Sequence, residues 1–260
     1  TGTLFLNIAA ASDQLRRRCS AHTFHVEASA AMYLDALTGW FVRAGHRKWV
    51  VLHGPDAEGE RRLNRATEAL KDRHWGARIA GTAVIARHDP SAAFALVRHK
   101  APAAVFPLAD WKTQLDFLAR YEAEGLTAPI VSFPEAATQT RSFYAKAMQA
   151  APRAGAAHRA ALWEPTLDAY GARELNARAA GRWGAPLDPA GWAAYQATRI
   201  AFDAARYAND PGGGAMAAYL STKGTVLDVH KGIGVSFRPW DHQLRQSLYL
   251  VRLNPDAGNS

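Results

Sequence analysis

Short polar segments follow several predicted strands, and their residue types suit the binding of a small ligand. Ser12 can donate a hydrogen bond from its hydroxyl group, and Trp111 can stack on a flat or apolar molecule. Ligands of α/β proteins bind at the carboxyl ends of parallel strands, where loops and helix N-termini converge. We therefore expect one ligand-binding cleft that is lined by Ala9, Ala10, Ser12, Asp56, Glu58, Asp110, Trp111 and Glu135.

Three of these segments also have a structural explanation that needs no ligand. Ser12 precedes a helix predicted over residues 14–18 and suits its N-cap. Asp110 suits the cap of a later helix, with Trp111 packed on the core. Glu135 would place a favourable negative charge in the first turn of a helix. The sequence leaves both interpretations open at each position.

Motifs of the common catalytic and metal sites are absent from the sequence. It contains no Gly-x-x-x-x-Gly-Lys-Ser/Thr loop, no Gly-x-Ser-x-Gly, no His-Glu-x-x-His, and no Gly-x-Gly-x-x-Gly after a strand. His22 and His25 would face opposite sides of a strand, and Asp241 and His242 would point apart in a surface turn. The single cysteine, Cys19, has no evident histidine partner. We therefore expect no enzyme activity, no metal ion and no cofactor.

The composition is that of a globular protein with a basic surface. The 260 residues are 48% hydrophobic and 21% charged, and the formal net charge is +8. The basic residues are dispersed, with Arg16-Arg17-Arg18 as the longest run, so the charge does not indicate a nucleic-acid-binding surface. No apolar run approaches the length of a membrane span.

Short apolar runs alternate with amphipathic stretches, which is typical of an α/β protein with a mainly parallel sheet. Strands are predicted over residues 4–8, 23–26, 48–53, 77–85, 103–107 and 129–132. Helices are predicted over residues 30–43, 60–73, 92–99, 110–124 and 136–150. Two further helices over 166–183 and 189–208 precede β segments near 226–228, 234–237 and 247–253.

This order of elements predicts two lobes, because the chain would leave one lobe, build the other and return. Residues 1–46 would begin lobe 1, and residues 47–162 would form lobe 2. Residues 163–224 would be the returning helices of lobe 1, and residues 225–260 would cross back to lobe 2. The expected fold class is therefore α/β, with two parallel sheets flanked by helices.

Three stretches of the sequence resemble one known family. Residues 23–59 resemble the crossover from one lobe to the other in branched-chain amino-acid-binding proteins, and residues 163–195 resemble their returning helices. The third stretch contains Lys231-Gly232 and Phe237-Arg238-Pro239-Trp240-Asp241-His242-Gln243-Leu244-Arg245-Gln246. It resembles the C-terminal motif of a subgroup found beside PQQ-dependent alcohol dehydrogenase systems. Over residues 4–253 the chain thus resembles a type I periplasmic solute-binding protein of an ABC importer.

The resemblance implies a protein that captures a small solute in the periplasm and delivers it to an ABC permease in the membrane. Its two lobes would be hinged, and it would act as a monomer without nucleic acid. The ligand would be an amino acid, a small organic acid or a solute related to alcohol oxidation. The loop with Ala9, Ala10 and Ser12 would hold a ligand carboxylate, and Glu135 would meet a ligand ammonium group.

Two departures from the family pattern bear on these expectations. Members of the family place an aromatic contact where this chain has Asp56 and Glu58. They also carry roughly a further hundred residues before the position of Leu4, which is the scale of a large part of a domain. Lobe 1 is therefore expected to lack its N-terminal part, and no signal peptide precedes Leu4 in this sequence.

Two other functions fit the same elements. A periplasmic sensing domain of the same fold would report its ligand to a receptor, and fused signalling segments would distinguish it. An α/β enzyme would need an acid, a base and a nucleophile that cluster in space, and no motif in the sequence indicates one.

Overall fold

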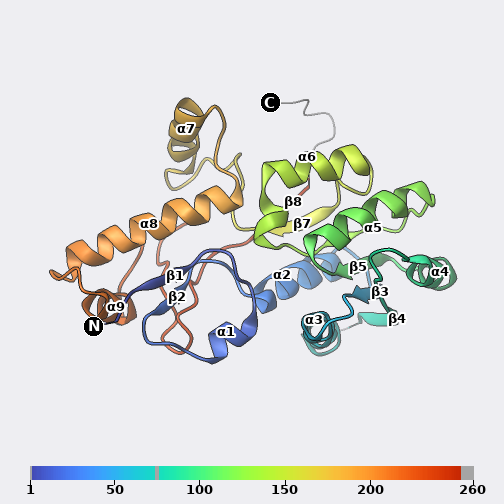
Figure 1. Cartoon of the computed structure of the whole chain (residues 1–260), viewed down its shortest axis with the longest axis horizontal. Helices are drawn as coiled ribbons and strands as arrows, with labels where there is room; N and C mark the ends of the chain where they lie inside the picture. The colour runs from blue at the N-terminus through green and yellow to red at the C-terminus, as the bar shows by residue number, and fades with distance from the viewer. Residues whose placement is uncertain (1, 74–75, 253–260) are drawn as a thin grey trace. The chain divides into compact units, whose positions relative to one another are not determined.

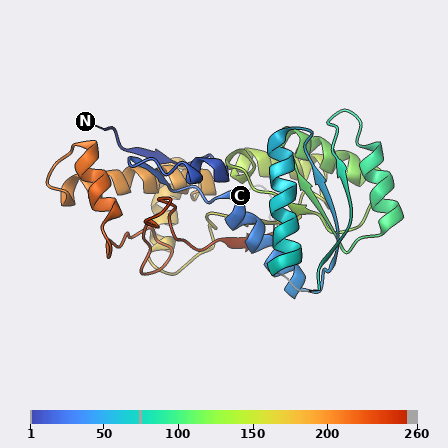
Figure 2. The ribbon, with the colours of Figure 1, turned by 90° about the horizontal axis from the view of Figure 1, so that it is seen from below.

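The computed structural model describes residues 2–73 and 76–252, whose elements are drawn in Figures 1 and 2. The chain packs as two compact units. Unit 1 combines the chain up to Ala30 with Ala161–Tyr249, and unit 2 combines Ala31–Ala160 with the chain from Leu250. Parallel strand pairs in both units confirm the predicted α/β class. The lobe boundaries predicted at residues 46, 162 and 224 stay a prediction.

Unit 2 is built on a parallel sheet with β3 (Lys48–His53) at its centre. This strand pairs with β4 (Arg78–Val84) on one side and with β5 (Ala104–Leu108) on the other. Residues 49–52 of β3 are fully buried, which is the pattern of a parallel strand that is covered on both faces.

A second three-stranded sheet has the order β6 (Val131–Ser132), β7 (His158–Ala161), β8 (Tyr249–Val251). A parallel bridge between Val105 and Ile130 joins β5 to the chain just before β6. Because β3, β5 and β6 run parallel, their carboxyl ends lie at the same edge, and the loops that follow them can meet there.

The helices of unit 2 connect these strands and bury apolar side chains against them. They are α2 (Ala30–Arg43), α3 (Ala57–Glu68), the π-helical turn η1 (Ala69–Arg73), α4 (Ser91–Lys100), α5 (Trp111–Ala123), the 3₁₀ turn η2 (Ala136–Gln139) and α6 (Arg141–Ala150). In the core, the rings of Phe94, Phe117 and Tyr121 contact one another at centroid distances of 5.4 to 6.2 Å. The helix predicted over residues 136–150 is divided, because Thr140 ends η2 and caps α6.

Unit 1 pairs β1 (Phe5–Asn7) in parallel with β2 (Thr23–His25). Its helices are α1 (Asp13–Arg17), α7 (Ala172–Trp183), α8 (Pro189–Tyr207) and α9 (Gly213–Ser221). In its core the buried rings of Trp163 and Trp192 stack at a centroid distance of 5.8 Å. No helix in the described part of the chain is both long and apolar enough to cross a bilayer.

Several local predictions for unit 1 are wrong. The helix predicted from residue 166 begins only at Ala172, because Tyr170 and Gly171 have left-handed backbones with φ of 55° and 74°. The β segments predicted near 226–228 and 234–237 form only isolated bridges, Leu227 to Val235 and Phe237 to Leu244. Asp241 lies in a turn as predicted, but His242 is not at the surface, because it is 7% exposed and its ring stacks on Phe24 at 4.3 Å.

Candidate ligand-binding site

The loop after β3 uses Asp56 to begin α3. The Oδ1 atom of Asp56 accepts a hydrogen bond of 2.7 Å from the backbone N–H of Gly59, so Asp56 is an N-cap. Gly59 is needed there, because a Cβ atom at this position would lie 2.3 Å from the carbonyl oxygen of Gly54. The first turn of α3 is therefore held close to the end of β3.

Glu58, in the same first turn, is paired with two arginines of α3. Its Oε2 atom accepts hydrogen bonds of 3.0 and 2.7 Å from Arg61, and its Oε1 atom lies 3.4 Å from Nε of Arg62. These are i,i+3 and i,i+4 pairs on one helix face. The carboxylate of Glu58 is thus compensated within its own helix.

The loop after β5 uses Asp110 in the same way to begin α5. Its carboxylate accepts hydrogen bonds from the backbone N–H groups of Lys112 and Thr113, at 2.9 and 3.2 Å, and from the Thr113 hydroxyl at 2.6 Å. Burial raises the pKa of Asp110, but these hydrogen bonds outweigh it and hold the pKa below its usual range. Trp111 is half-buried and packs against the hydrophobic core of unit 2. Asp110 therefore caps α5 and Trp111 packs on the core, as the explanation without a ligand predicts for both residues.

The loop after β6 carries Glu135, whose carboxylate is bound by Arg62. The distance from Nη1 of Arg62 to Oε1 of Glu135 is 2.6 Å, and both side chains are mostly buried. Burial raises the pKa of Glu135 above its usual range, and the neighbouring Arg62 opposes that shift. The guanidinium carbon of Arg62 also lies 4.7 Å from the centroid of the Phe133 ring.

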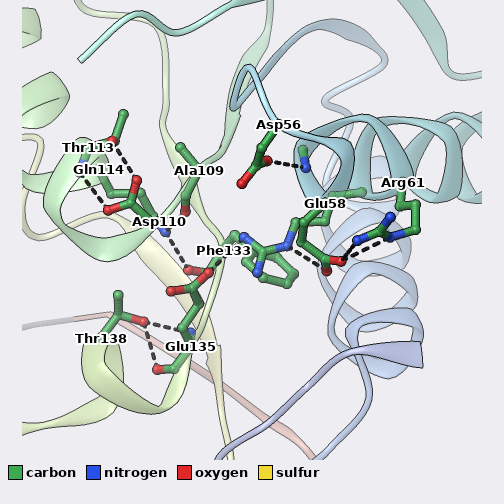
Figure 3. Close-up of polar contacts among 12 residues, drawn as sticks. Asp56, Glu58, Arg61, Ala109, Asp110, Thr113, Gln114, Phe133, Glu135 and Thr138 are labelled. Carbon is green, nitrogen blue, oxygen red and sulfur yellow. Dashed lines mark hydrogen bonds and ion pairs between the residues drawn. The ribbon is translucent and has the colours of Figure 1, made fainter. Parts of the chain in front are cut away.

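Figure 3 shows Asp56, Glu58, Asp110 and Glu135 around the carboxyl ends of these neighbouring strands. The charges of Asp110 and Glu58 both act on Glu135, which agrees with this grouping. Buried Gln114 links the loops after β5 and β6, because its amide donates to the carbonyl oxygens of Ala109 and Phe133 at 2.7 and 3.1 Å. The four acidic residues predicted for the site in unit 2 thus lie in one cluster, whereas Trp111 packs against the core.

In unit 1, the predicted loop with Ala9, Ala10 and Ser12 follows β1. The backbone N–H groups of Ala9 and Ala10 donate to the side-chain oxygen of Asn7, at 3.2 and 2.9 Å, so Asn7 already uses these two amides. Buried Arg16 donates to the carbonyl oxygens of Ala10 and Ser12, at 2.6 and 3.0 Å. The Ser12 hydroxyl makes no cap hydrogen bond to α1, so the capping explanation does not hold for this side chain.

The family model described as "Periplasmic binding protein" matches residues 1–259. The chain belongs to the periplasmic binding protein family. Among curated proteins, no sequence matches this binding protein significantly. The resemblance to the subgroup beside PQQ-dependent dehydrogenases has no counterpart in these findings and stays a prediction.

Solved structures of similar fold share little sequence with this binding protein. A branched-chain amino-acid ABC transporter ligand-binding protein from Burkholderia xenovorans has a TM-score of 0.82 at 16% identity, with 99% of this chain and 67% of that chain covered. A leucine-, isoleucine-, valine-, threonine- and alanine-binding protein from Brucella ovis has the same score and identity, with 98% and 65% covered. A solute-binding protein from R. palustris in complex with benzoate has a TM-score of 0.78 at 17% identity, with 96% and 67% covered. This chain thus spans about two thirds of their length.

The third resembling stretch holds unit 1 of this binding protein together. Gln243 is fully buried and accepts a hydrogen bond of 3.0 Å from Nε of Arg16. Lys231 donates to the side-chain oxygen of Gln246 at 2.8 Å and lies 4.3 Å from the centroid of the Trp192 ring. Burial lowers the pKa of Lys231 well below its usual value, against the opposing charge of Glu27. These contacts give the stretch a structural role.

Within residues 2–73 and 76–252, no three side chains of the metal-binding types gather closely enough to hold an ion. The predicted absence of metal and cofactor stays an expectation. Asn7, Arg16, Arg62 and Gln114 were missed by the sequence reasoning. Local spacing could have indicated the i,i+4 pair of Glu58 and Arg62 and the hydrogen bonds that Asn7 accepts from the N–H groups of Ala9 and Ala10.

Proposed function

We propose that this binding protein captures a small solute in the periplasm for an ABC importer and acts as a monomer. The family match over residues 1–259 carries the proposal. The loops with Asp56, Asp110 and Glu135 would contribute ligand contacts from unit 2, and the loop with Ser12 would contribute them from unit 1. Catalysis is not part of the proposal, because binding proteins of this family act by capture and release.

The solute that we propose is a small organic acid or an amino acid. Structures of similar fold were solved with benzoate and with 3,4-dihydroxybenzoic acid, and another is named for leucine, isoleucine, valine, threonine and alanine. Ligand binding would shift the population of conformers toward one that the permease recognises. The shift requires only that the ligand binds one conformer more tightly than the other.

Isothermal titration calorimetry on the full-length protein tests this function. The panel is leucine, benzoate, 3,4-dihydroxybenzoate and PQQ, followed by a wider set of amino acids and organic acids. We expect saturable heat with at least one small acid or amino acid. No heat with any of these solutes would contradict the proposal.

A serine variant tests whether unit 1 contributes to binding. Ser12→Ala removes a hydroxyl that caps nothing, so we expect little change in stability and about fivefold weaker binding, since one hydrogen bond is worth about 1 kcal/mol. The exposed Ser20 of the same unit provides the control variant Ser20→Ala. If Ser12→Ala and Ser20→Ala have equal dissociation constants for the ligand, Ser12 does not contribute to binding.

A further inference from the structure

The acidic side chains of the unit 2 loops already have partners within the protein. Asp56 and Asp110 accept backbone N–H groups at the starts of α3 and α5. Glu58 is paired with Arg61, and Glu135 is paired with Arg62. A positively charged ligand group that approached Glu135 would therefore share its carboxylate with Arg62.

Arg62 is the partner that such a ligand would meet at Glu135. Its side chain is 15% exposed, and its guanidinium group is held by Glu135, by Glu58 and by the face of Phe133. Its Nε atom is buried and makes no hydrogen bond, but lies 3.4 Å from Oε1 of Glu58 as an ion pair. An ammonium group that displaced Arg62 from Glu135 would leave a mostly buried guanidinium group with one partner fewer, which is unfavourable.

An ammonium group that instead shared Glu135 with Arg62 would lie beside a like charge. Like charges repel more strongly in a site with little solvent than in water. A ligand without positive charge meets neither difficulty, because it leaves the pair of Arg62 and Glu135 intact.

We propose that Arg62 sets the ligand class of unit 2, by excluding ligands with an ammonium group in favour of organic acids without one. This inference rests on the proposed function and narrows it. Arg62 occupies the position beside Glu135 that the positively charged group of a ligand would otherwise take. The expected solute is therefore an organic acid and not an α-amino acid.

Pairs of ligands that differ only in the amino group test the inference in the full-length protein. The pairs are phenylalanine with 3-phenylpropionate, and leucine with 4-methylpentanoate. We expect calorimetry to give at least tenfold tighter binding of the acid without the amino group in at least one pair. Tighter binding of the amino acid in both pairs would overturn the inference.

The variant Arg62→Met removes the charge and keeps most of the side-chain length. It should reduce the preference for the acid without the amino group at least fivefold. The matched control is Arg61→Met, since Arg61 is 44% exposed and, within the described residues, pairs with Glu58 and not with Glu135. An identical preference in both variants and in the wild type would overturn the inference while the proposed function stands.

A second variant keeps the inference testable if Arg62→Met does not fold. Glu135→Gln removes the counter-ion and leaves Arg62 in place, so binding of the preferred acid should become several-fold tighter. Weaker binding of that acid would overturn the role of Arg62. If the wild type binds no member of either pair and gives no heat with the wider panel of solutes, both the proposed function and this inference are wrong.

Discussion

His25 shows how burial changes the chemistry of a single side chain in this binding protein. It lies in β2 with 2% of its surface exposed, and its Nδ1 atom lies 2.9 Å from the side-chain nitrogen of Asn7. Burial, and then the charge of Arg16, lower the pKa of His25 from 6.5 to about 4. The folded protein therefore resists protonation of a group that the unfolded chain protonates readily.

This shift predicts a loss of stability in mild acid. Because the pKa of His25 is lower in the folded state, the unfolded chain binds more protons between pH 6.5 and about pH 4. The free energy of unfolding should fall as the pH drops through this window, by at most about 1.4 kcal/mol per pH unit and about 3 kcal/mol in total. Urea unfolding at pH 7 and pH 4.5 measures the loss.

Variants separate His25 from the other groups that titrate in the same range. His25→Asn should be less stable than the wild type at pH 7, because packing is lost, but should lose less stability on acidification. The half-buried His22 of the same unit gives the control His22→Asn, which should keep the full loss. Equal losses in the wild type and in His25→Asn would show that His25 does not carry the effect.

At the scale of elements, the start of α3 decides where the loop of Asp56 and Glu58 lies. Helix α3 approaches the end of β3 closely because Gly59 has no side chain, since a Cβ atom would lie 2.3 Å from a backbone oxygen of Gly54. Backbone atoms cannot swing aside as a flexible side chain can. The variant Gly59→Ala should therefore push α3 away and lower the free energy of unfolding by about 1 to 3 kcal/mol.

A second helical glycine supplies a control in which the same substitution should raise the free energy of unfolding. Gly181 lies in α7, and a Cβ atom there would meet nothing within 4 Å. Gly181→Ala should raise the free energy of unfolding by about 0.5 to 1 kcal/mol, because alanine favours the helix. Urea unfolding of both variants gives the comparison. A gain of stability in Gly59→Ala would show that the loop after β3 adjusts without strain.

At the scale of the whole molecule, the sequence predicts most of the elements, because apolar runs and caps are local signals. Residues 48–53 form the predicted buried strand, and Asp56 and Asp110 lie at the helix starts that their types favour. Contacts between distant segments have no such signal. The pairing of Arg62 with Glu135 and the contacts of Arg16 with Gln243 depend on how strands and loops are brought together in space. The left-handed backbone at Tyr170, which delays the start of α7, was not foreseen because a tyrosine rarely adopts a positive φ.

Ligand binding should also be visible in the stability of the whole protein. A ligand that binds only the folded state, at about 100 times its dissociation constant, stabilises that state by about 2.7 kcal/mol. For a protein of this size the unfolding midpoint should rise by about 5 to 10 °C, which differential scanning calorimetry on the full-length protein measures. If Arg62 sets the ligand class, the acid without an amino group should raise the midpoint more than its amino-acid counterpart at equal concentration. Binding heat without any rise in the midpoint would mean that the ligand does not prefer the folded protein, and the heat would then be no sign of a specific site.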